Sequence, residues 1–80
     1  MKIVIYGTGC KKCKQLFANA EQAVRLAGVE AEVTKVEQVA DIVQAGVMFT
    51  PALAIDGQVK AAGRVLPPEK IADLLRAAAG

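Results

Sequence analysis

The only two cysteines of the chain, Cys10 and Cys13, are separated by two residues, which is the spacing of a dithiol that can open and close as a disulfide. The chain has no histidine, so this CxxC motif is the one constellation able to carry nucleophilic or redox chemistry. Both thiols lie where an apolar segment and a glycine-containing loop give way to a helical pattern. The motif therefore favours thiol-disulfide exchange, with half of a zinc site and a structural disulfide as alternatives.

The two thiols are not expected to be equivalent, because only one of them lies at the start of the predicted helix. Unpaired backbone N–H groups and the positive end of the helix dipole favour a thiolate there, so Cys10 is the predicted nucleophile. Cys13 falls on the apolar face of the same helix and is the predicted resolving thiol. Three neighbouring cations would lower the pKa of Cys10 further, or would form no more than a solvated first turn; these are Lys11, Lys12 and Lys14.

The apolar pattern along the chain predicts an α/β fold with the element order βαβαββα. The first strand is apolar without alternation, so we expect it in the centre of the sheet, covered on both faces. A strand, a helix and a second strand follow one another early in the chain, and such a βαβ unit makes the two strands parallel. Asp56-Gly57 predicts a tight hairpin between the last two strands. The expected strands are 2–6, 29–36, 51–55 and 59–62, and the expected helices are 10–27, 38–45 and 68–78.

Helical periodicity also predicts which side chains are buried. One apolar stripe of the first helix is expected to face the core, and Asn19 falls outside this stripe. The short second helix is expected to direct Val39, Ile42 and Val43 inward. The predicted stripe of the first helix comprises Cys13, Leu16, Phe17, Ala20, Val24 and Ala27.

Length and composition are those of a small packed domain. The 80 residues suffice for one domain, 1–80, and 54% hydrophobic against 22% charged residues is the balance of a globular chain. A net charge of +2 and three aromatic residues leave no basic stripe with stacking rings, which argues against nucleic-acid binding. No apolar segment is long enough for a signal peptide core or a membrane span, so we expect a cytoplasmic monomer without membrane insertion.

A resemblance to a known family adds to this interpretation. The GTGCKKC segment after the first strand, Thr50-Pro51 before the third strand, the IDG turn and the final helix resemble a minimal thioredoxin fold. More closely, the chain resembles the small thioredoxin/glutaredoxin-like redox-active disulfide proteins of bacteria and archaea, over essentially its whole length. We therefore predict a thioredoxin-like α/β fold whose mixed four-stranded sheet, in the order 2-1-3-4, is packed between helices.

The same resemblance carries implications for the site. It implies a cis Thr50–Pro51 bond beside the cysteines, and the backbone of Thr50 would then be free to pair with an extended substrate. Gly7 and Gly9 are expected to be turn glycines, with close approach of the substrate backbone, for which Gly9 is the candidate, as the alternative. The implied partners are protein disulfides and a thioredoxin-reductase-like electron donor, with no cofactor besides the Cys10–Cys13 disulfide.

Departures from the thioredoxin pattern bear on specificity and mechanism. Gly9 stands where thioredoxins have Trp, and Lys11-Lys12 replaces their Gly-Pro. The first strand, with Ile3, Val4 and Ile5, has no buried acid to take the proton of the resolving thiol, so proton transfer is expected to need water or a nearby lysine. The segment 62–65 lacks the glutathione motif of glutaredoxins, so glutathione binding is not expected.

Two rival functions are left open by the residues. Soft-metal carriers also place two thiols at a strand-to-helix junction, where thiolates bind Cu(I), and an arsenic or zinc site could be shared between two chains. Copper-trafficking domains of this kind end in a strand, whereas the pattern of Ile71, Leu74 and Leu75 predicts that this chain ends in a helix, which favours the redox interpretation. A docking module that uses the fold only as a surface is the other alternative.

Overall fold

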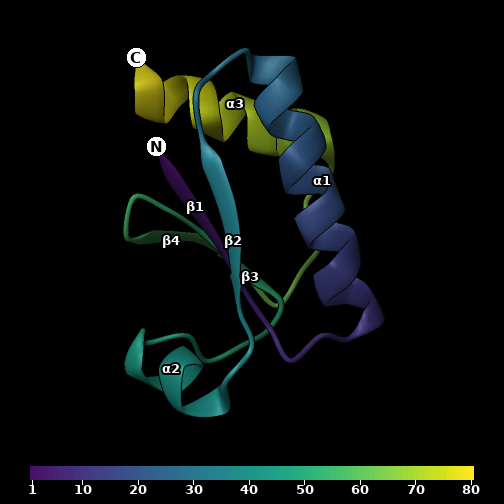
Figure 1. Ribbon diagram of the computed structural model, residues 1–80, viewed down its shortest axis with the longest axis vertical. Helices are drawn as coiled ribbons and strands as arrows, with labels where there is room; N and C mark the ends of the chain where they lie inside the picture. Colours follow the sequence, from purple (N-terminus) through teal and green to yellow (C-terminus); the bar gives the residue numbers. More distant parts are fainter.

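The computed structural model describes all 80 residues, and its elements follow the predicted order. The strands are β1 (Lys2–Tyr6), β2 (Glu32–Val36), β3 (Ala52–Ile55) and β4 (Gln58–Ala62), and the helices are α1 (Lys11–Ala27), α2 (Val39–Gln44) and α3 (Pro68–Ala79). The strands form one sheet in the order β2-β1-β3-β4, which confirms the predicted topology (Figure 1). The expected bounds agree closely except at β2, which begins at Glu32 rather than at residue 29, because its pairing with β1 begins at Lys2 and Glu32.

β1 lies inside the sheet, where it pairs parallel with β2 and antiparallel with β3. β3 continues through the Asp56-Gly57 turn into β4, and both turn residues have positive φ, 48° and 85°, as a two-residue type I′ hairpin requires. The turn is also tied to β1. The N–H of Lys2 donates to Asp56 Oδ1 at 2.8 Å, and the N–H of Asp56 donates to the carbonyl of Lys2 at 2.8 Å.

The two long helices, α1 and α3, pack on the same face of the sheet, whereas α2 covers only one end of the opposite face (Figure 1). Ile42 of α2 packs there with Val47 and Ala52. Val4 and Tyr6 of β1 point to this second face and are only half-buried, so the expectation that β1 is covered on both faces is wrong. A helix of 6 residues is too short to cover the sheet. The main core comprises Ile3, Ile5, Leu16, Ala20, Ala23, Leu53, Ile55, Ile71, Ala72 and Leu75.

The buried face of α1 is wider than the predicted stripe, because α1 packs against α3 as well as against the sheet. Phe17, Val24 and Ala27 are only half-buried, whereas Asn19, predicted to lie outside the stripe, is 8% exposed. The Asn19 amide donates to the carbonyl of Leu66 at 3.0 Å, and its oxygen accepts a hydrogen bond from the Gln15 amide at 2.9 Å. These partners satisfy the polar group and allow its burial.

The prediction for the inward face of α2 is correct for one residue and wrong for two. Ile42 is buried, but Val39 and Val43 are 63% and 67% exposed. The short helix contacts the sheet through a single residue, so its other apolar side chains lie in solvent.

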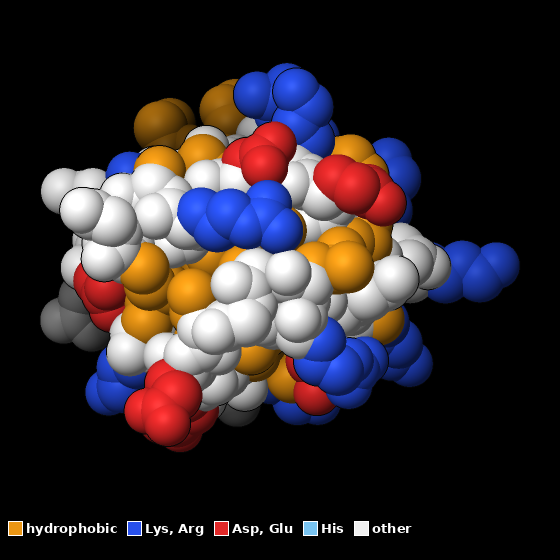
Figure 2. All heavy atoms as spheres, turned by 90° about the horizontal axis from the view of Figure 1, so that it is seen from above, with side chains coloured by type: hydrophobic (Ala, Val, Ile, Leu, Met, Phe, Trp, Pro, Cys, Tyr) orange, Lys and Arg blue, Asp and Glu red, His pale blue; other side chains and the backbone are white.

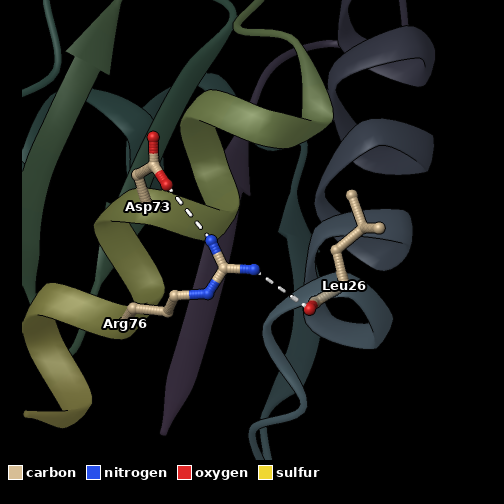
Figure 3. Close-up of polar contacts among 3 residues, drawn as sticks. All are labelled: Leu26, Asp73 and Arg76. Atoms are coloured by element: carbon tan, nitrogen blue, oxygen red, sulfur yellow. Dashed lines mark hydrogen bonds and ion pairs between the residues drawn. The ribbon is translucent and has the colours of Figure 1, made fainter.

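Arg76 joins the end of α3 to the end of α1 (Figure 3). Its guanidinium donates to the carbonyl of Leu26 at 3.1 Å and to Asp73 Oδ1 at 3.1 Å. The last carbonyls of a helix have no partner within the helix, so this side chain satisfies a group that the fold would otherwise leave to water. Asp73 holds the guanidinium in place, and the pair fixes α3 relative to α1.

Charges of both signs are distributed over the surface. Figure 2 views the molecule from the end that carries α3, and there basic and acidic side chains are interspersed with apolar ones. None of the three helices combines the length and the apolar character that a membrane span requires.

Candidate active site

The first turn of α1 holds the two cysteines at different depths. Cys10 is the N-cap residue, in an extended conformation, and its side chain is exposed, whereas Cys13 is 5% exposed. The N–H of Cys13 donates to Cys10 Sγ at 3.4 Å, so the sulfur atom satisfies one of the unpaired N–H groups of the helix start. Both residues are free thiols, with their Sγ atoms 2.8 Å apart. The pair can close to a disulfide without movement of the helix.

This arrangement shifts the pKa values of the two thiols in opposite directions. The pKa of Cys10 is lowered, first by the hydrogen bond with the Cys13 side chain and then by the N–H of Cys13, against a small opposing effect of burial. The pKa of Cys13 is raised, chiefly by burial and next by the hydrogen bond with Cys10. Cys10 is therefore the first of the two thiols to ionise as the pH rises, and Cys13 keeps its proton to higher pH.

The three lysines predicted to tune Cys10 all lie exposed on the first turn of α1. The backbone N–H of Lys12 contributes to the lowered pKa of Cys10, but the larger causes are the hydrogen bonds from Cys13. A tuning role for the side-chain charges of Lys11, Lys12 and Lys14 stays a prediction.

The expectation that Gly7 is a turn glycine is wrong, because this residue, which directly follows β1, contacts the buried thiol instead. It is buried and its φ is not positive, so it is not needed as a turn glycine. A Cβ at Gly7 would clash with Cys13 Sγ and lie 3.0 Å from Cys13 Cβ. Glycine is required at this position because the resolving thiol occupies the space of a side chain. Gly9, with φ of 88°, is a turn glycine as predicted, and its contact with substrate stays a prediction.

The Thr50–Pro51 segment lies beside Cys13. The Thr50–Pro51 bond is cis, as the resemblance implied, and the Pro51 Cα lies 4.0 Å from the point that a Cβ on Gly7 would occupy. The carbonyl of Pro51 accepts from the N–H of Gly63 at 2.9 Å, which anchors the loop to the end of β4. Thr50 is exposed, and neither its N–H nor its carbonyl is hydrogen-bonded within the chain.

A cavity of about 140 Å³ opens beside the buried thiol. It brings two charged residues to the site that sequence analysis did not assign to it, Lys35 of β2 and Glu37 just after β2. Parallel pairing places the end of β2 next to the loop that follows β1, since the N–H of Gly7 donates to the carbonyl of Val36 at 3.0 Å. The predicted βαβ unit was the signal that could have located them. The cavity is lined by Ile5, Gly7, Gly9, Cys13, Lys14, Phe17, Lys35 and Glu37.

Sequence comparison with known proteins identifies the family of this chain. Residues 1–76 match the family model described as a thioredoxin domain. A thioredoxin of Methanothermobacter thermautotrophicus is 45% identical over 75 residues, which cover 94% of this chain and 97% of that protein. A thioredoxin of Methanocaldococcus jannaschii is 38% identical over 74 residues, covering 92% of this chain and 85% of that protein. The chain belongs to the thioredoxin family. It is a thioredoxin-like oxidoreductase with its CxxC motif at positions 10 and 13.

The soft-metal alternative gains no support from this thioredoxin-like site. No group of three or more His, Cys, Asp or Glu side chains is arranged to hold a metal ion. Cys10 and Cys13 are the only thiols of the chain, and a structural zinc site takes four ligands.

The pKa shifts predict a pH dependence of thiol alkylation. Only the thiolate reacts, so the lowered pKa should keep Cys10 reactive as the pH falls, whereas the raised pKa should restrict Cys13 to alkaline solution. Alkylation by iodoacetamide, followed at each cysteine by peptide mass spectrometry, measures both profiles. In a Cys13→Ala variant the profile of Cys10 should move to higher pH, because its main hydrogen-bond partner is lost. Identical profiles for the two wild-type cysteines would contradict this assignment.

Proposed function

We propose that the chain reduces disulfides in other proteins, with Cys10 as the attacking thiol and Cys13 as the resolving thiol. The observation that carries this proposal is the pair of sulfur atoms 2.8 Å apart, one exposed with a lowered pKa and one buried with a raised pKa. An exposed thiolate can reach the disulfide of another protein, and a buried thiol one turn away can reach the bond that results.

The reaction consists of two consecutive thiol-disulfide exchanges. The Cys10 thiolate attacks one sulfur of the substrate disulfide, forms a mixed disulfide and releases the first substrate thiolate. Cys13 then loses its proton and attacks Cys10 Sγ, which breaks the mixed disulfide and releases the second substrate thiolate. The substrate has gained two electrons, and the chain holds a Cys10–Cys13 disulfide. A reductase-like electron donor then restores the dithiol.

The Thr50–Pro51 segment supports a mode of substrate binding. The free N–H and carbonyl of Thr50 lie next to the cysteines and can pair with an extended segment that flanks the substrate disulfide. Gly9 has no side chain to obstruct that segment on the other side of Cys10. Pairing of this kind involves the substrate backbone and not its side chains, so we propose that the chain accepts a range of protein substrates. We also propose that it acts as a monomer.

Reduction of insulin by dithiothreitol tests this function. The chain should accelerate the precipitation of the insulin B chain, and a Cys10→Ser variant should be indistinguishable from the reaction without protein. An Arg64→Gln variant, altered at an exposed residue that has no hydrogen bond or ion pair to the site, is the control and should keep wild-type activity. The proposal fails if the wild-type chain does not accelerate the reaction, or if it does not cycle between dithiol and disulfide.

A further inference from the structure

The resolving step needs a group that takes the proton of Cys13. The thiol is buried, so its own ionisation is disfavoured, and the thiolate is the form that attacks a disulfide. No side chain is hydrogen-bonded to Cys13 apart from that of Cys10, which is blocked as a mixed disulfide at this stage. Beneath the cysteines, β1 contributes Ile5, the residue after β1 that lines the cavity is Gly7, and neither has an ionisable side chain.

The cavity beside Cys13 supplies the missing group. Four titratable residues line it: Cys13 and Lys14 from α1, Lys35 from β2, and Glu37 from the segment after β2. A lysine ammonium group has three N–H donors and no acceptor, so neither lysine is suited to take up a proton. Glu37 is the only carboxylate among the four.

The Glu37 carboxylate lies between Lys35 and the loop at Gly9. Its Oε1 lies 3.6 Å from Lys35 Nζ, and its Oε2 lies 2.9 Å from the point where a Cβ on Gly9 would stand. The carboxylate therefore rests against the loop that leads into the CxxC motif. Lys35 shares a register position with Ile5 of β1, which directs it to the face of the sheet that α1 covers.

We propose that Glu37 accepts the proton of Cys13 through water in this cavity, with Lys14 and Lys35 as the cations that stabilise the charges. The cavity of about 140 Å³ has room for several waters. The side chains of Lys14, Lys35 and Glu37 in its lining give them polar partners, and the half-exposed Glu37 side chain connects them to solvent. This inference rests on the proposed function.

The proton and the electrons balance across the step. The Cys13 S–H gives its proton to water, which gives one to the Glu37 carboxylate, so the products are a Cys13 thiolate and a neutral Glu37. The thiolate attacks Cys10 Sγ, forms the Cys10–Cys13 bond and breaks the bond between Cys10 and the substrate. The electron pair of that broken bond leaves on the substrate thiolate, and Glu37 returns its proton to solvent.

Reaction of the reduced chain with the aromatic disulfide DTNB separates the two exchanges. The first thionitrobenzoate is released when Cys10 attacks, at a rate proportional to the DTNB concentration, and the second is released when Cys13 resolves the mixed disulfide, at a rate independent of it. Glu37→Gln should slow the second release about tenfold. Loss of a general base often costs ~100-fold in rate, but here bulk water can take the proton in its place, so the expected loss is smaller. The first release should not change.

The pH profile distinguishes proton transfer from a structural effect. Loss of the proton acceptor in Glu37→Gln should make the rate of the second release rise more steeply with pH across the neutral range. Glu37→Asp should restore part of the wild-type rate. Glu32→Gln removes a carboxylate from β2, outside the cavity, and should leave both releases unchanged.

Two results would overturn the inference without touching the proposed function. One is a second release that keeps its wild-type rate and its wild-type pH profile in Glu37→Gln. The other is a second release that slows in Lys35→Gln and keeps its wild-type rate in Glu37→Gln, which would make the lysine the proton carrier. If wild-type protein releases only one thionitrobenzoate, the proposed function itself fails.

Discussion

In a Cys13→Ser variant, Cys10 should capture a disulfide as a mixed disulfide that persists at least about a thousandfold longer than in the wild-type chain. The reason is proximity, because Cys13 Sγ lies 2.8 Å from Cys10 Sγ and attacks within the same molecule. Serine keeps the size of the side chain but is not a nucleophile toward disulfides. The complex must then wait for a thiol from solution, whose effective concentration is far lower.

Intact-mass spectrometry of the chain mixed with a cystine-linked peptide measures this capture. The Cys13→Ser variant should gain the mass of one half of the peptide, and a reducing agent should remove it. The matched Cys10→Ser variant should gain little, because the remaining thiol is buried and its pKa is raised. Capture by Cys10→Ser and not by Cys13→Ser would reverse the two roles.

A Gly7→Ala substitution should lower the free energy of unfolding of the reduced chain by about 1 to 3 kcal/mol, the range for adding a methyl group where no space exists. The new Cβ would clash with Cys13 Sγ. The end of β1 has little freedom to retreat, since the N–H of Gly7 is bonded to the carbonyl of Val36 and Pro51 lies on the other side. Displacement of Cys13 should also slow closure of the disulfide.

Urea unfolding in a double-mutant cycle isolates the contact between the two residues. In a Cys13→Ala background the clashing sulfur is absent, so Gly7→Ala should be less destabilising there, with a coupling of about 1 kcal/mol or more. The tight approach to the Cβ at position 13 remains, so part of the destabilisation should persist. Equal effects in both backgrounds would mean that the sulfur does not set the requirement for glycine.

Local pattern was sufficient to predict the element order and the two cysteines, because each is encoded by neighbours in the chain, whereas the sheet order came with the family resemblance. The element order followed from periodicity, the β3–β4 hairpin from Asp56-Gly57, and the position of the thiols from the strand-to-helix junction. The cis bond of Pro51 came only from the family resemblance, since a proline at the start of a strand is compatible with either isomer.

The features that could not be predicted depend on contacts between segments far apart in the sequence. Asn19 is buried because the chain before α3 offers it the carbonyl of Leu66, and the pattern of α1 alone places a polar residue in solvent. The role of Gly7 depends on the depth of Cys13 beneath the loop. Glu37 was invisible as a site residue because its relation to the cysteines exists only through the parallel pairing of β1 and β2.

The unequal covering of the two sheet faces determines where this chain can tolerate substitutions. Nearly all of its packing is shared among α1, α3 and one side of the strands, so substitutions there are constrained by many neighbours at once. The segment from Gln38 to Gly46 is attached mainly through Ile42. Mutational tolerance is therefore concentrated in that segment, where residues can be exchanged without disturbing the layer that carries the redox pair.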